Sequence, residues 1–469
     1  MILRLALWAV LALPLAAQET SRWNVVLILA DDLGWSDLGC TGSTFYETPA
    51  IDRLASQGMR FTQAYSACNV CSPTRASIMT GKYPARLHTT NFFGGNRRGA
   101  LLPPEYRQSL PAEETTLAEA FKQAGYRTGF AGKWHLGGKG SLPGDHGFDA
   151  VLALKTSPSG GPADDPHFAT LISTQAAQFL DESKDKSFFL YMPLHSPHVG
   201  LKTRPELAAK YKAKVAALPA PPGPREVPAG PGFKARAVQD HAVYAGMIQE
   251  MDEAVDRILK KLDEHKLSDR TVVVFLSDNG GLSTAEGSPT CNLPLRAGKG
   301  WNYEGGHRIP WIVRMPGRVA PKTECDVPVI SQDLYPTLLE LAGVPVPAGQ
   351  AVDALSLVPL LDRKGGLPER TLFWHYPHYS NQGGRPGGAM RTGNFKLLEF
   401  FEDSRVELYD LGSDPGEQHD LAAAQPERAE DLKKKLAEWR KSVGAQMPTP
   451  NPDPVEPFGP KGLPPKPEK

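Results

Sequence analysis

The sequence lacks net charge and long apolar segments. Its 52 Lys and Arg residues balance 52 Asp and Glu residues, so the formal net charge is zero. A chain with this balance has no long-range attraction for nucleic acid or for an anionic membrane, so we expect neither as a partner. An anionic substrate must therefore be held by local positive groups. After the first residues, no stretch approaches the roughly 18 apolar residues of a membrane-spanning helix, so we expect no stable membrane insertion.

Cysteine is scarce as well, with five residues in 469. Cys68 and Cys71 have the C-x-x-C spacing, which in a cytosolic protein would suggest a disulfide oxidoreductase. A zinc site would need a second pair of Cys or His at comparable spacing, and the sequence has none. The pair therefore predicts neither kind of site.

The first residues resemble a secretory signal peptide. Arg4 precedes an apolar run from Leu5 to about Ala12, and small residues stand at Ala16 and Ala17. We expect residues 1–17 to be removed and the protein to be exported, to the periplasm or the extracellular space. An uncleaved anchoring helix is the alternative.

Buried strands alternate with amphipathic helices along most of the chain. Continuous apolar runs rich in branched residues predict strands at Asn24–Ala30, Arg127–Ala131, Ser187–Met192 and Thr271–Ser277. Apolar residues from Tyr244 to Leu262 share one face of a predicted helix. This alternation predicts an α/β domain over residues 18–364, with a large, mostly parallel sheet flanked by helices on both faces.

The last third of the chain has a different pattern. Short strands at Phe395–Phe400 and Val406–Tyr409, followed by a helix over Glu427–Ser442, predict a small C-terminal α+β subdomain over residues 365–446, built on an antiparallel sheet. Residues 447–469 are rich in proline and predict an extended arm or a disordered tail. A second proline-rich stretch, residues 218–231, predicts a surface excursion.

Oxygen-bearing side chains follow two of the predicted strands. Asp31 and Asp32 come directly after the first strand, and Asp278 and Asn279 follow the strand that ends at Ser277. Ligands of such sheets bind beyond the carboxyl ends of the strands, and calcium or magnesium prefers oxygen ligands. The four residues therefore predict a metal site, the alternative being that they cap helices or shape turns.

Candidate proton carriers and cations occupy similar positions. Lys133 and His135 lie just past one predicted strand, and His195 lies just past another. This placement favours acid and base roles for the two histidines over the satisfied surface or core role that most histidines have. Lys299 stands between two glycines, which permit close approach of the backbone to a ligand, although such a loop more often carries a solvated lysine.

The stretch Cys71-Ser72-Pro73-Thr74-Arg75 leads into a short helical pattern and completes a set of motifs. In chain order these are LILADDLGWSDLGCTG, CSPTRASIMTGKYPAR, GYRTGFAGKWHLG, PLHSPH, LSDNGG and GKGWNYEGGHRIPWIVRMPG. Together they resemble the type I sulfatases of the alkaline phosphatase-like superfamily over nearly the whole chain after the predicted signal peptide. Lys82 departs from the pattern, because the family often has Arg there.

The resemblance implies a cofactor set and a role for each motif residue. A maturation enzyme would convert Cys71 to formylglycine (3-oxoalanine), which would bind one calcium ion together with Asp31, Asp32, Asp278 and Asn279. The implied residues of the sulfate pocket are Arg75, Lys133, His135, His195 and Lys299. Once Cys71 is converted, four cysteines remain, namely Cys40, Cys68, Cys291 and Cys325, and they can form two disulfides or none.

The implied substrate is a sulfated carbohydrate or an aryl sulfate. A segment of aromatic and imidazole groups from Phe373 to Tyr379 suits a sugar, although a strand at the edge of the core explains it equally well. The candidate sugar contacts are His307, His375, His378 and Arg391. Two other functions fit the same fold, a phosphate or phosphonate monoester hydrolase and an inactive sugar-binding scaffold. Cys71 in its motif argues against the first, and the filled polar positions argue against the second.

Overall fold

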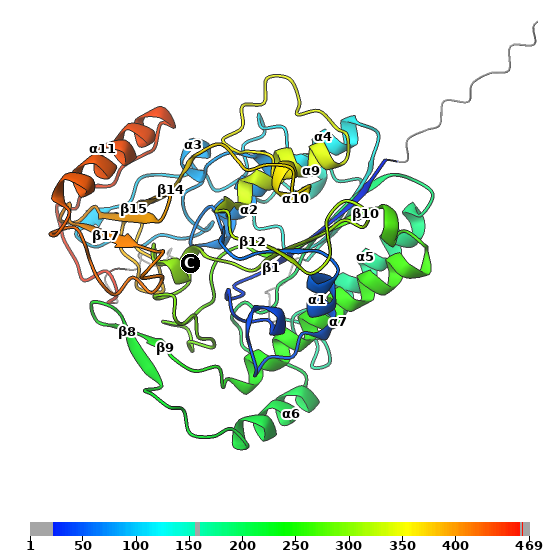
Figure 1. Ribbon diagram of the computed structural model, residues 1–469, viewed down its shortest axis with the longest axis horizontal. Coiled ribbons are helices and arrows are strands. Elements are labelled where there is room, and N and C mark those ends of the chain that lie inside the picture. The colour runs from blue at the N-terminus through cyan, green and yellow to red at the C-terminus, as the bar shows by residue number, and fades with distance from the viewer. Residues whose placement is uncertain (1–21, 155–159, 460–461, 463–469) are drawn as a thin grey trace, which may run out of the picture.

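The computed structural model describes residues 22–154, 160–459 and 462. The predicted signal peptide, residues 1–17, lies outside this range. Within it, eight strands form a large sheet in the order β12-β2-β11-β10-β1-β7-β5-β6 (Figure 1). Their bounds in that order are Thr323–Cys325, Met59–Phe61, Trp311–Arg314, Thr271–Ser277, Asn24–Ala30, Phe188–Pro193, Arg127–Gly132 and Ala150–Ala153. Only β11 runs against its neighbours, so the predicted α/β class with a mostly parallel sheet is confirmed.

Strand β1 lies in the middle of the sheet and is buried on both faces. Its side chains alternate between two apolar clusters, with Val25, Leu27 and Leu29 on one face and Val26 and Ile28 on the other. This alternation explains why the strand reads as a continuous apolar run in the sequence. Covering both faces requires helices on each side of the sheet.

Helices supply both covers, as Figure 1 shows. One face is packed by α1 (Pro49–Ser56), α5 (Ala169–Ser183) and α7 (Ala242–Glu264), with α6 (Pro205–Ala216) against α7. The other face is packed by α2 (Cys71–Thr80), α4 (Leu117–Gln123), α9 (Leu334–Leu341) and α10 (Val358–Leu361). Two single-turn helices, α3 (Pro84–Leu87) and α8 (Glu304–His307), lie in the connections.

A separate antiparallel sheet follows, as predicted. Its four strands, in spatial order, are β14 (Thr371–Tyr376), β15 (Gly387–Thr392), β16 (Phe395–Phe400) and β17 (Val406–Asp410). Helix α11 (Pro426–Ser442) packs on this sheet through Leu432 and Leu436.

Three small two-stranded sheets complete the described chain. They pair β13 (Val329–Ile330) with β3 (Ala64–Tyr65), β18 (Thr449–Pro450) with β4 (Leu101–Leu102), and β8 (Glu226–Gly230) with β9 (Phe233–Arg236). Residues 218–231, which were expected to form a surface excursion, thus include strand β8. Pro228 is tolerated there because the register of this two-stranded hairpin shifts between Pro228 and Gly230, so not every backbone nitrogen has to donate a hydrogen bond to the partner strand. In the described part of the proline-rich tail, Thr449–Pro450 forms strand β18 and residues 456–459 form a turn. Asn451 donates hydrogen bonds to the carbonyls of Gly99 and Ala100.

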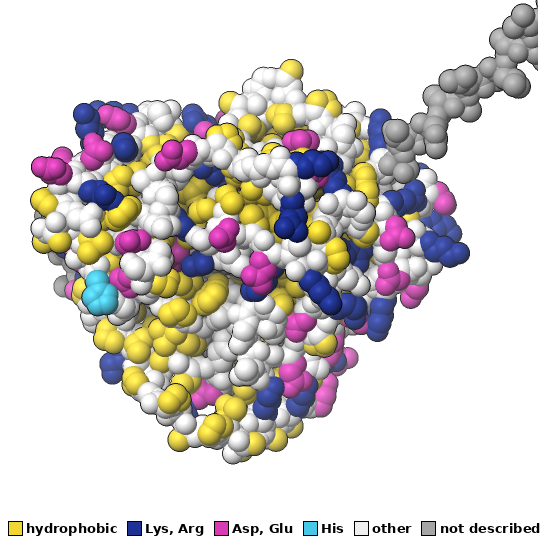
Figure 2. Space-filling model, viewed as in Figure 1, with side chains coloured by type: hydrophobic (Ala, Val, Ile, Leu, Met, Phe, Trp, Pro, Cys, Tyr) yellow, Lys and Arg dark blue, Asp and Glu magenta, His cyan; other side chains and the backbone are white. Residues whose placement is uncertain are grey.

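The balanced composition predicts a surface of mixed charge. On the face seen in Figure 2, basic and acidic side chains are interspersed without a large field of one sign. All five cysteines lie in the described part of the chain, and none of them forms a disulfide there. Among the described residues, no helix combines the length and apolar character needed to cross a membrane.

Candidate active site

The carboxyl ends of the central parallel strands bring the motif residues together. Ala30, the last residue of β1, pairs with Ser277, the last residue of β10, so Asp31 and Asp278 emerge side by side. The backbone nitrogen of Asp31 bonds to the carbonyl of Ser196 beyond β7, and that of Lys133 to Pro193 at the end of β7. The loops that follow the four neighbouring strands β10, β1, β7 and β5 therefore meet at one edge of the sheet.

Asp31, Asp32, Asp278 and Asn279 form a buried group of oxygen atoms. Asn279 Nδ2 donates to Asp32 Oδ1 over 2.9 Å, and the backbone nitrogen of Asp32 donates to Asp278 Oδ1 over 3.2 Å. Asp31 Oδ1 and Asn279 Oδ1 have no hydrogen-bond partner. One oxygen each from Asp31 and Asp278 lies within 4.8 Å of the other and of Cys71 Sγ. Unpartnered buried oxygens within a group of acidic side chains fit a hard divalent cation.

Two lysines compensate part of the acidic charge. Lys133 Nζ lies 2.5 Å from Asp31 Oδ2, and Lys299 Nζ lies 2.7 Å from Asp32 Oδ2. Burial alone would raise the pKa of Asp31, but the nearby cations, Lys133 first, hold it well below its usual value. Gly298 lets the Lys299 loop approach this closely, because a Cβ there would meet the carbonyl oxygen of Gly281 at 2.2 Å.

Arg75 contacts the third carboxylate of the group, that of Asp278. Its Nε and Nη2 both lie 2.8 Å from Asp278 Oδ2, and its Nη1 donates to the carbonyl of Lys133 over 2.7 Å. Burial, and then the neighbouring Asp31, raise the pKa of Asp278 despite this contact. The carboxylates are thus crowded, and a divalent cation would relieve their repulsion.

Cys71 is the first residue of α2 and faces this group. It is buried, and its Sγ lies 3.3 Å from His135 Nδ1. Thr74 Oγ1 accepts a hydrogen bond from the backbone nitrogen of Cys68, which fixes the entry to the helix. A helix N-terminus carries partial positive charge, so an anion at residue 71 is favoured there.

Three histidines line the pocket with Cys71, of which His195 is buried and His135 and His198 are partly buried. Burial, followed by the charge of Lys133, lowers the pKa of His135 and of His195 to about 3. Neither ring nitrogen of His195 has a hydrogen-bond partner. His198 was given no role from the sequence, yet its Nε2 lies 3.7 Å from Asp32 Oδ2, and its place in the His195-Ser-Pro-His198 motif was the available signal.

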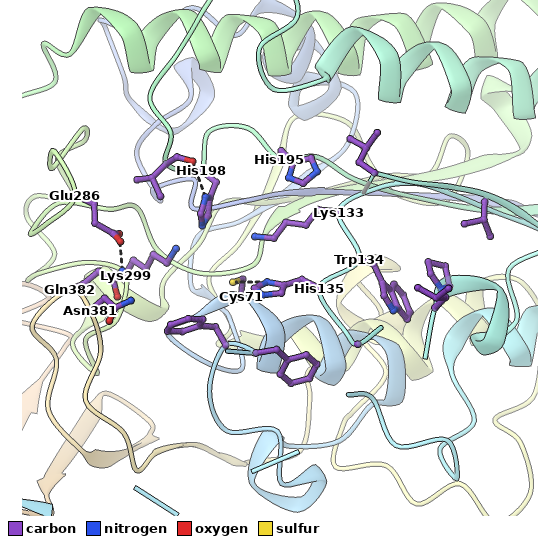
Figure 3. Close-up of a pocket in the computed structure, with 18 residues that line it drawn as sticks. Cys71, Lys133, Trp134, His135, His195, His198, Glu286, Lys299, Asn381 and Gln382 are labelled. Carbon is purple, nitrogen blue, oxygen red and sulfur yellow. Dashed lines mark hydrogen bonds between the residues drawn. The ribbon is translucent and has the colours of Figure 1, made fainter. Parts of the chain in front are cut away.

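These side chains open into a pocket of about 880 Å³, seen in Figure 3. Of the six candidate catalytic residues, Cys71, Lys133, His135, His195 and Lys299 line it, whereas Arg75 is buried beneath them. The other lining residues are Phe92, Phe93, Trp134, Gly137, Leu142, Pro143, Val151, Leu154, His198, Val199, Glu286, Asn381 and Gln382. Trp134, Gly137 and His198 lie within motifs that the sequence already shows. The remaining pocket contacts, Glu286, Asn381 and Gln382 among them, could not be predicted because separate segments without a motif supply them.

The four candidate sugar contacts do not line this pocket. His307 packs against Trp374, and His375 Nε2 lies 2.8 Å from the carbonyl of Gln446. His378 Nε2 lies 2.8 Å from Thr90 Oγ1, and Arg391 bonds to Tyr65 and Gln63. All four are buried. Residues 373–376 of the aromatic and imidazole segment belong to strand β14, whose side chains are mostly buried, in accord with the alternative explanation of a strand at the edge of the core.

The chain matches the family model described as Sulfatase over residues 23–344. The chain belongs to the sulfatase family. It is therefore a sulfuric ester hydrolase with the alkaline phosphatase-like fold. A model described as N-sulphoglucosamine sulphohydrolase, C-terminal, matches residues 297–442.

Similar proteins match this sulfatase over most of its length. Human arylsulfatase A is 34% identical, covering 87% of this chain and 86% of its own. A sulfatase of Formosa agariphila is 30% identical and covers 93% of each chain. The solved structure of Ps i-CgsB in complex with k-i-k-neocarrahexaose superposes with a TM-score of 0.72 at 26% identity, over 89% of this chain and 93% of that one.

Proposed function

We propose that this sulfatase cleaves sulfate esters with a formylglycine made from Cys71 and a calcium ion, and that its substrate is a sulfated carbohydrate. The observation that carries the proposal is the position of Cys71 at the N-terminus of α2, with Asp31 and Asp278 within 4.8 Å and His135 at 3.3 Å. An anion-binding helix end, an acidic metal site and a proton carrier meet at this one side chain.

Calcium would be held by Asp31, Asp32, Asp278 and Asn279. The two unpartnered oxygens, Asp31 Oδ1 and Asn279 Oδ1, provide ligand atoms that the protein itself does not use. When bound, calcium polarises the sulfate oxygens and lowers the pKa of the attacking hydroxyl.

A maturation enzyme is the partner that this proposal requires, because the thiol of Cys71 must be oxidised before the reaction. When hydrated, formylglycine supplies a geminal diol, whose second hydroxyl allows the sulfate to be expelled. The role of the protein around residue 71 is to position that group and to hold charge.

Two lysines would contact the sulfate group, and Arg75 would support them from beneath. Lys133 and Lys299 line the pocket with Nζ atoms already drawn to Asp31 and Asp32, so their positions are set before substrate arrives. Arg75 lies beneath them and supports the carbonyl of Lys133. Charge that develops on the sulfate in the transition state meets these preorganised groups.

Two histidines would move the protons. His195 reaches the pocket with both ring nitrogens unpartnered, which suits donation to the leaving oxygen. The negative charge of a bound sulfate ester opposes the effect of Lys133 and raises the pKa of His195 toward the range needed for an acid. His135 is neutral at physiological pH and lies beside residue 71, where it would accept the proton.

A carbohydrate substrate is supported by a related structure and by the expected route of the protein. Ps i-CgsB was solved in complex with a neocarrahexaose. A signal peptide at residues 1–17 would export the enzyme to the compartment where polysaccharides are met. We also propose the division into residues 18–364 and 365–446, with the tail after them.

Mass spectrometry of one tryptic peptide tests the proposal. Residues 61–75 contain both Cys68 and Cys71, so after expression with a maturation enzyme and thiol alkylation, Cys68 should be labelled and residue 71 should not. A fully active protein with both thiols labelled would contradict the formylglycine mechanism.

Steady-state kinetics on matched esters tests the reaction. Catalytic efficiency on 4-nitrophenyl sulfate should exceed that on 4-nitrophenyl phosphate. A preference for phosphate would contradict the proposed use of the pocket and favour a phosphate monoester hydrolase.

A further inference from the structure

The charged and uncharged residues of the pocket are separated by depth. Among the described lining residues, the only lysines or arginines are Lys133 and Lys299, and both are buried and paired with aspartates. The outer lining contains the exposed side chains Leu142 and Val151 together with other apolar groups. Positive charge is thus available at the sulfate end and is missing from the outer lining.

One side of the pocket is polar. Figure 3 shows Glu286, Gln382 and Asn381 beside Lys299, on the opposite side of Cys71 from Trp134. Gln382 Nε2 donates to Glu286 Oε2 over 2.9 Å. Asn381 is exposed, and its Oδ1 accepts a hydrogen bond from Arg97 Nε over 3.3 Å. We call Glu286, Asn381 and Gln382 the polar wall.

Gln382 is held rigidly in this wall. Its carbonyl accepts hydrogen bonds from Trp301 Nε1 over 2.8 Å and from Thr284 Oγ1 over 2.9 Å. The side chain is only 3% exposed, and its Oε1 has no partner. A buried polar atom without a partner beside a pocket is an available acceptor for a ligand.

Glu286 supplies the negative charge of the wall. It is exposed, and its backbone has a φ of 52°, in the left-handed region that glycine favours. Such conformations of bulky residues concentrate at ligand-binding sites, because surrounding contacts must hold them. Here the hydrogen bond from Gln382 is the contact that holds the carboxylate.

Resting on the proposed function, we infer that Glu286 determines specificity by restricting this sulfatase to substrates that carry a single anionic group. In such a substrate the alcohol that carries the sulfate is uncharged. Its hydroxyl groups contact Glu286 and Gln382, and its apolar face packs against the opposite side of the pocket. A second sulfate or a carboxylate near the polar wall meets the charge of Glu286. The lining residues offer it no lysine or arginine other than Lys133 and Lys299, which are already paired with Asp31 and Asp32 at the sulfate end. Two like charges a few ångströms apart in a partly exposed pocket reduce binding by about 10-fold or more.

The test compares two 4-nitrophenyl sulfates that differ only in one ring substituent, a hydroxyl or a carboxylate. The measured quantity is the ratio of kcat/KM for the hydroxyl ester to that for the carboxylate ester, with the substituent at each free ring position in turn. We expect a ratio of about 10 or more for the unmodified enzyme at one position at least. Glu286→Gln should lower that ratio several-fold, and Glu286→Lys should bring it below one.

Glu438→Lys is the matched control, because it makes the same charge change on the exposed side of α11. It should leave the ratio unchanged. A ratio that stays within two-fold across Glu286→Gln and Glu286→Lys would overturn the inference. Failure of the unmodified enzyme to hydrolyse unsubstituted 4-nitrophenyl sulfate would instead overturn the proposed function, because that ester carries no second charge.

Discussion

Two groups of buried charged residues in this molecule differ in whether their oxygen atoms are used. The first, the catalytic cluster, is made of Asp31, Asp32, Asp278, Asn279, Arg75, Lys133 and Lys299. The second, the inner cluster, joins Glu304 on α8, Lys396 on β16, Glu417 and Tyr65. In the inner cluster Lys396 Nζ lies 3.0 Å from Glu304 Oε1 and 2.9 Å from Glu417 Oε1. The remaining oxygens accept from Tyr65 Oη and from the backbone nitrogen of Glu304, each over 2.7 Å.

The catalytic cluster is left incomplete by the protein. Asp31 Oδ1 and Asn279 Oδ1 have no partner, and the two lysines open into the pocket. Similar side chains at similar burial thus have two different roles, one in stabilising the fold and one in binding a ligand. In the inner cluster each carboxylate oxygen lies within 3.0 Å of a protein cation or donor, although Glu417 Oε1 meets Lys396 Nζ without hydrogen-bond geometry, and the charges join two parts of the fold. In the catalytic cluster the unpartnered oxygens leave the charges able to bind a ligand.

The largest expected effect comes from Asp31→Asn, which removes a charge from the catalytic cluster. Calcium binding should be lost, and kcat/KM on 4-nitrophenyl sulfate should fall about 10³-fold or more, because a metal ion contributes several kcal/mol to transition-state stabilisation. Elemental analysis of the purified protein gives the calcium content. Asp37→Asn is the control, because Asp37 is buried nearby but bonds to Thr290 and Tyr244. Normal calcium content in Asp31→Asn would contradict the metal assignment.

The inner cluster should respond in stability and not in catalysis. Lys396→Met leaves Glu304 and Glu417 buried without their cation, so the free energy of unfolding should fall by about 3–5 kcal/mol. Urea unfolding measures this loss, and kcat per folded molecule should stay the same. Lys435→Met, which removes an exposed ion pair with Asp431 on α11, should cost about 0.5 kcal/mol or less. A loss below about 1 kcal/mol for Lys396→Met would contradict the stabilising role assigned to the inner cluster.

The sequence predicts the catalytic cluster far better than the inner one. Asp31, Asp278 and Lys133 stand directly after apolar runs, and parallel strands bring their carboxyl ends to one edge whatever the rest of the chain does. Lys396 and Glu417 carry no such signal. Lys396 lies in a strand of mixed polarity, and its partners come from α8 and a loop, so only the packing of the antiparallel sheet on the main domain brings them together.

The same reason separates the histidines that line the pocket from those that do not. His135 and His195 follow parallel strands and line the pocket. His375 and His378 lie within and just after β14, where the side chains pack into the protein. An aromatic and imidazole segment has the same composition in a sugar site and in a buried strand, so composition could not distinguish the two. The polar wall comes from loops at Glu286 and Gln382, which no local pattern joins.

His195→Gln tests this distinction between histidines. Loss of a general acid should lower kcat on 4-nitrophenyl sulfate about 10²-fold, and more on an alkyl sulfate, because a poorer leaving group depends more on protonation. His378→Gln is the control, because Thr90 Oγ1 occupies its Nε2 away from the pocket. It should leave kcat and KM unchanged. A raised KM in His378→Gln on a sulfated sugar would restore His378 as a sugar contact.

The last expected effect is a pH dependence of stability located in the inner cluster. Burial raises the pKa of Glu417 from 4.5 to about 7, with Glu304 adding to the rise and Lys396 opposing it. Between these values the unfolded chain releases a proton that the folded chain keeps. Stability from this group is therefore full below pH 4.5 and falls as the pH rises to 7, by at most about 1.4 kcal/mol per pH unit.

Glu417→Gln should remove this slope, because the amide does not titrate. Urea unfolding of both proteins at pH 5 and pH 7 measures the difference. Asp37 and Asp252, whose pKa values burial raises to about 6, contribute equally to both proteins and cancel. The variant should also keep its kcat at both pH values, because Glu417 does not line the pocket. Equal slopes in the two proteins would mean that Glu417 is ionised in the folded state, with Lys396 compensating both carboxylates of the inner cluster.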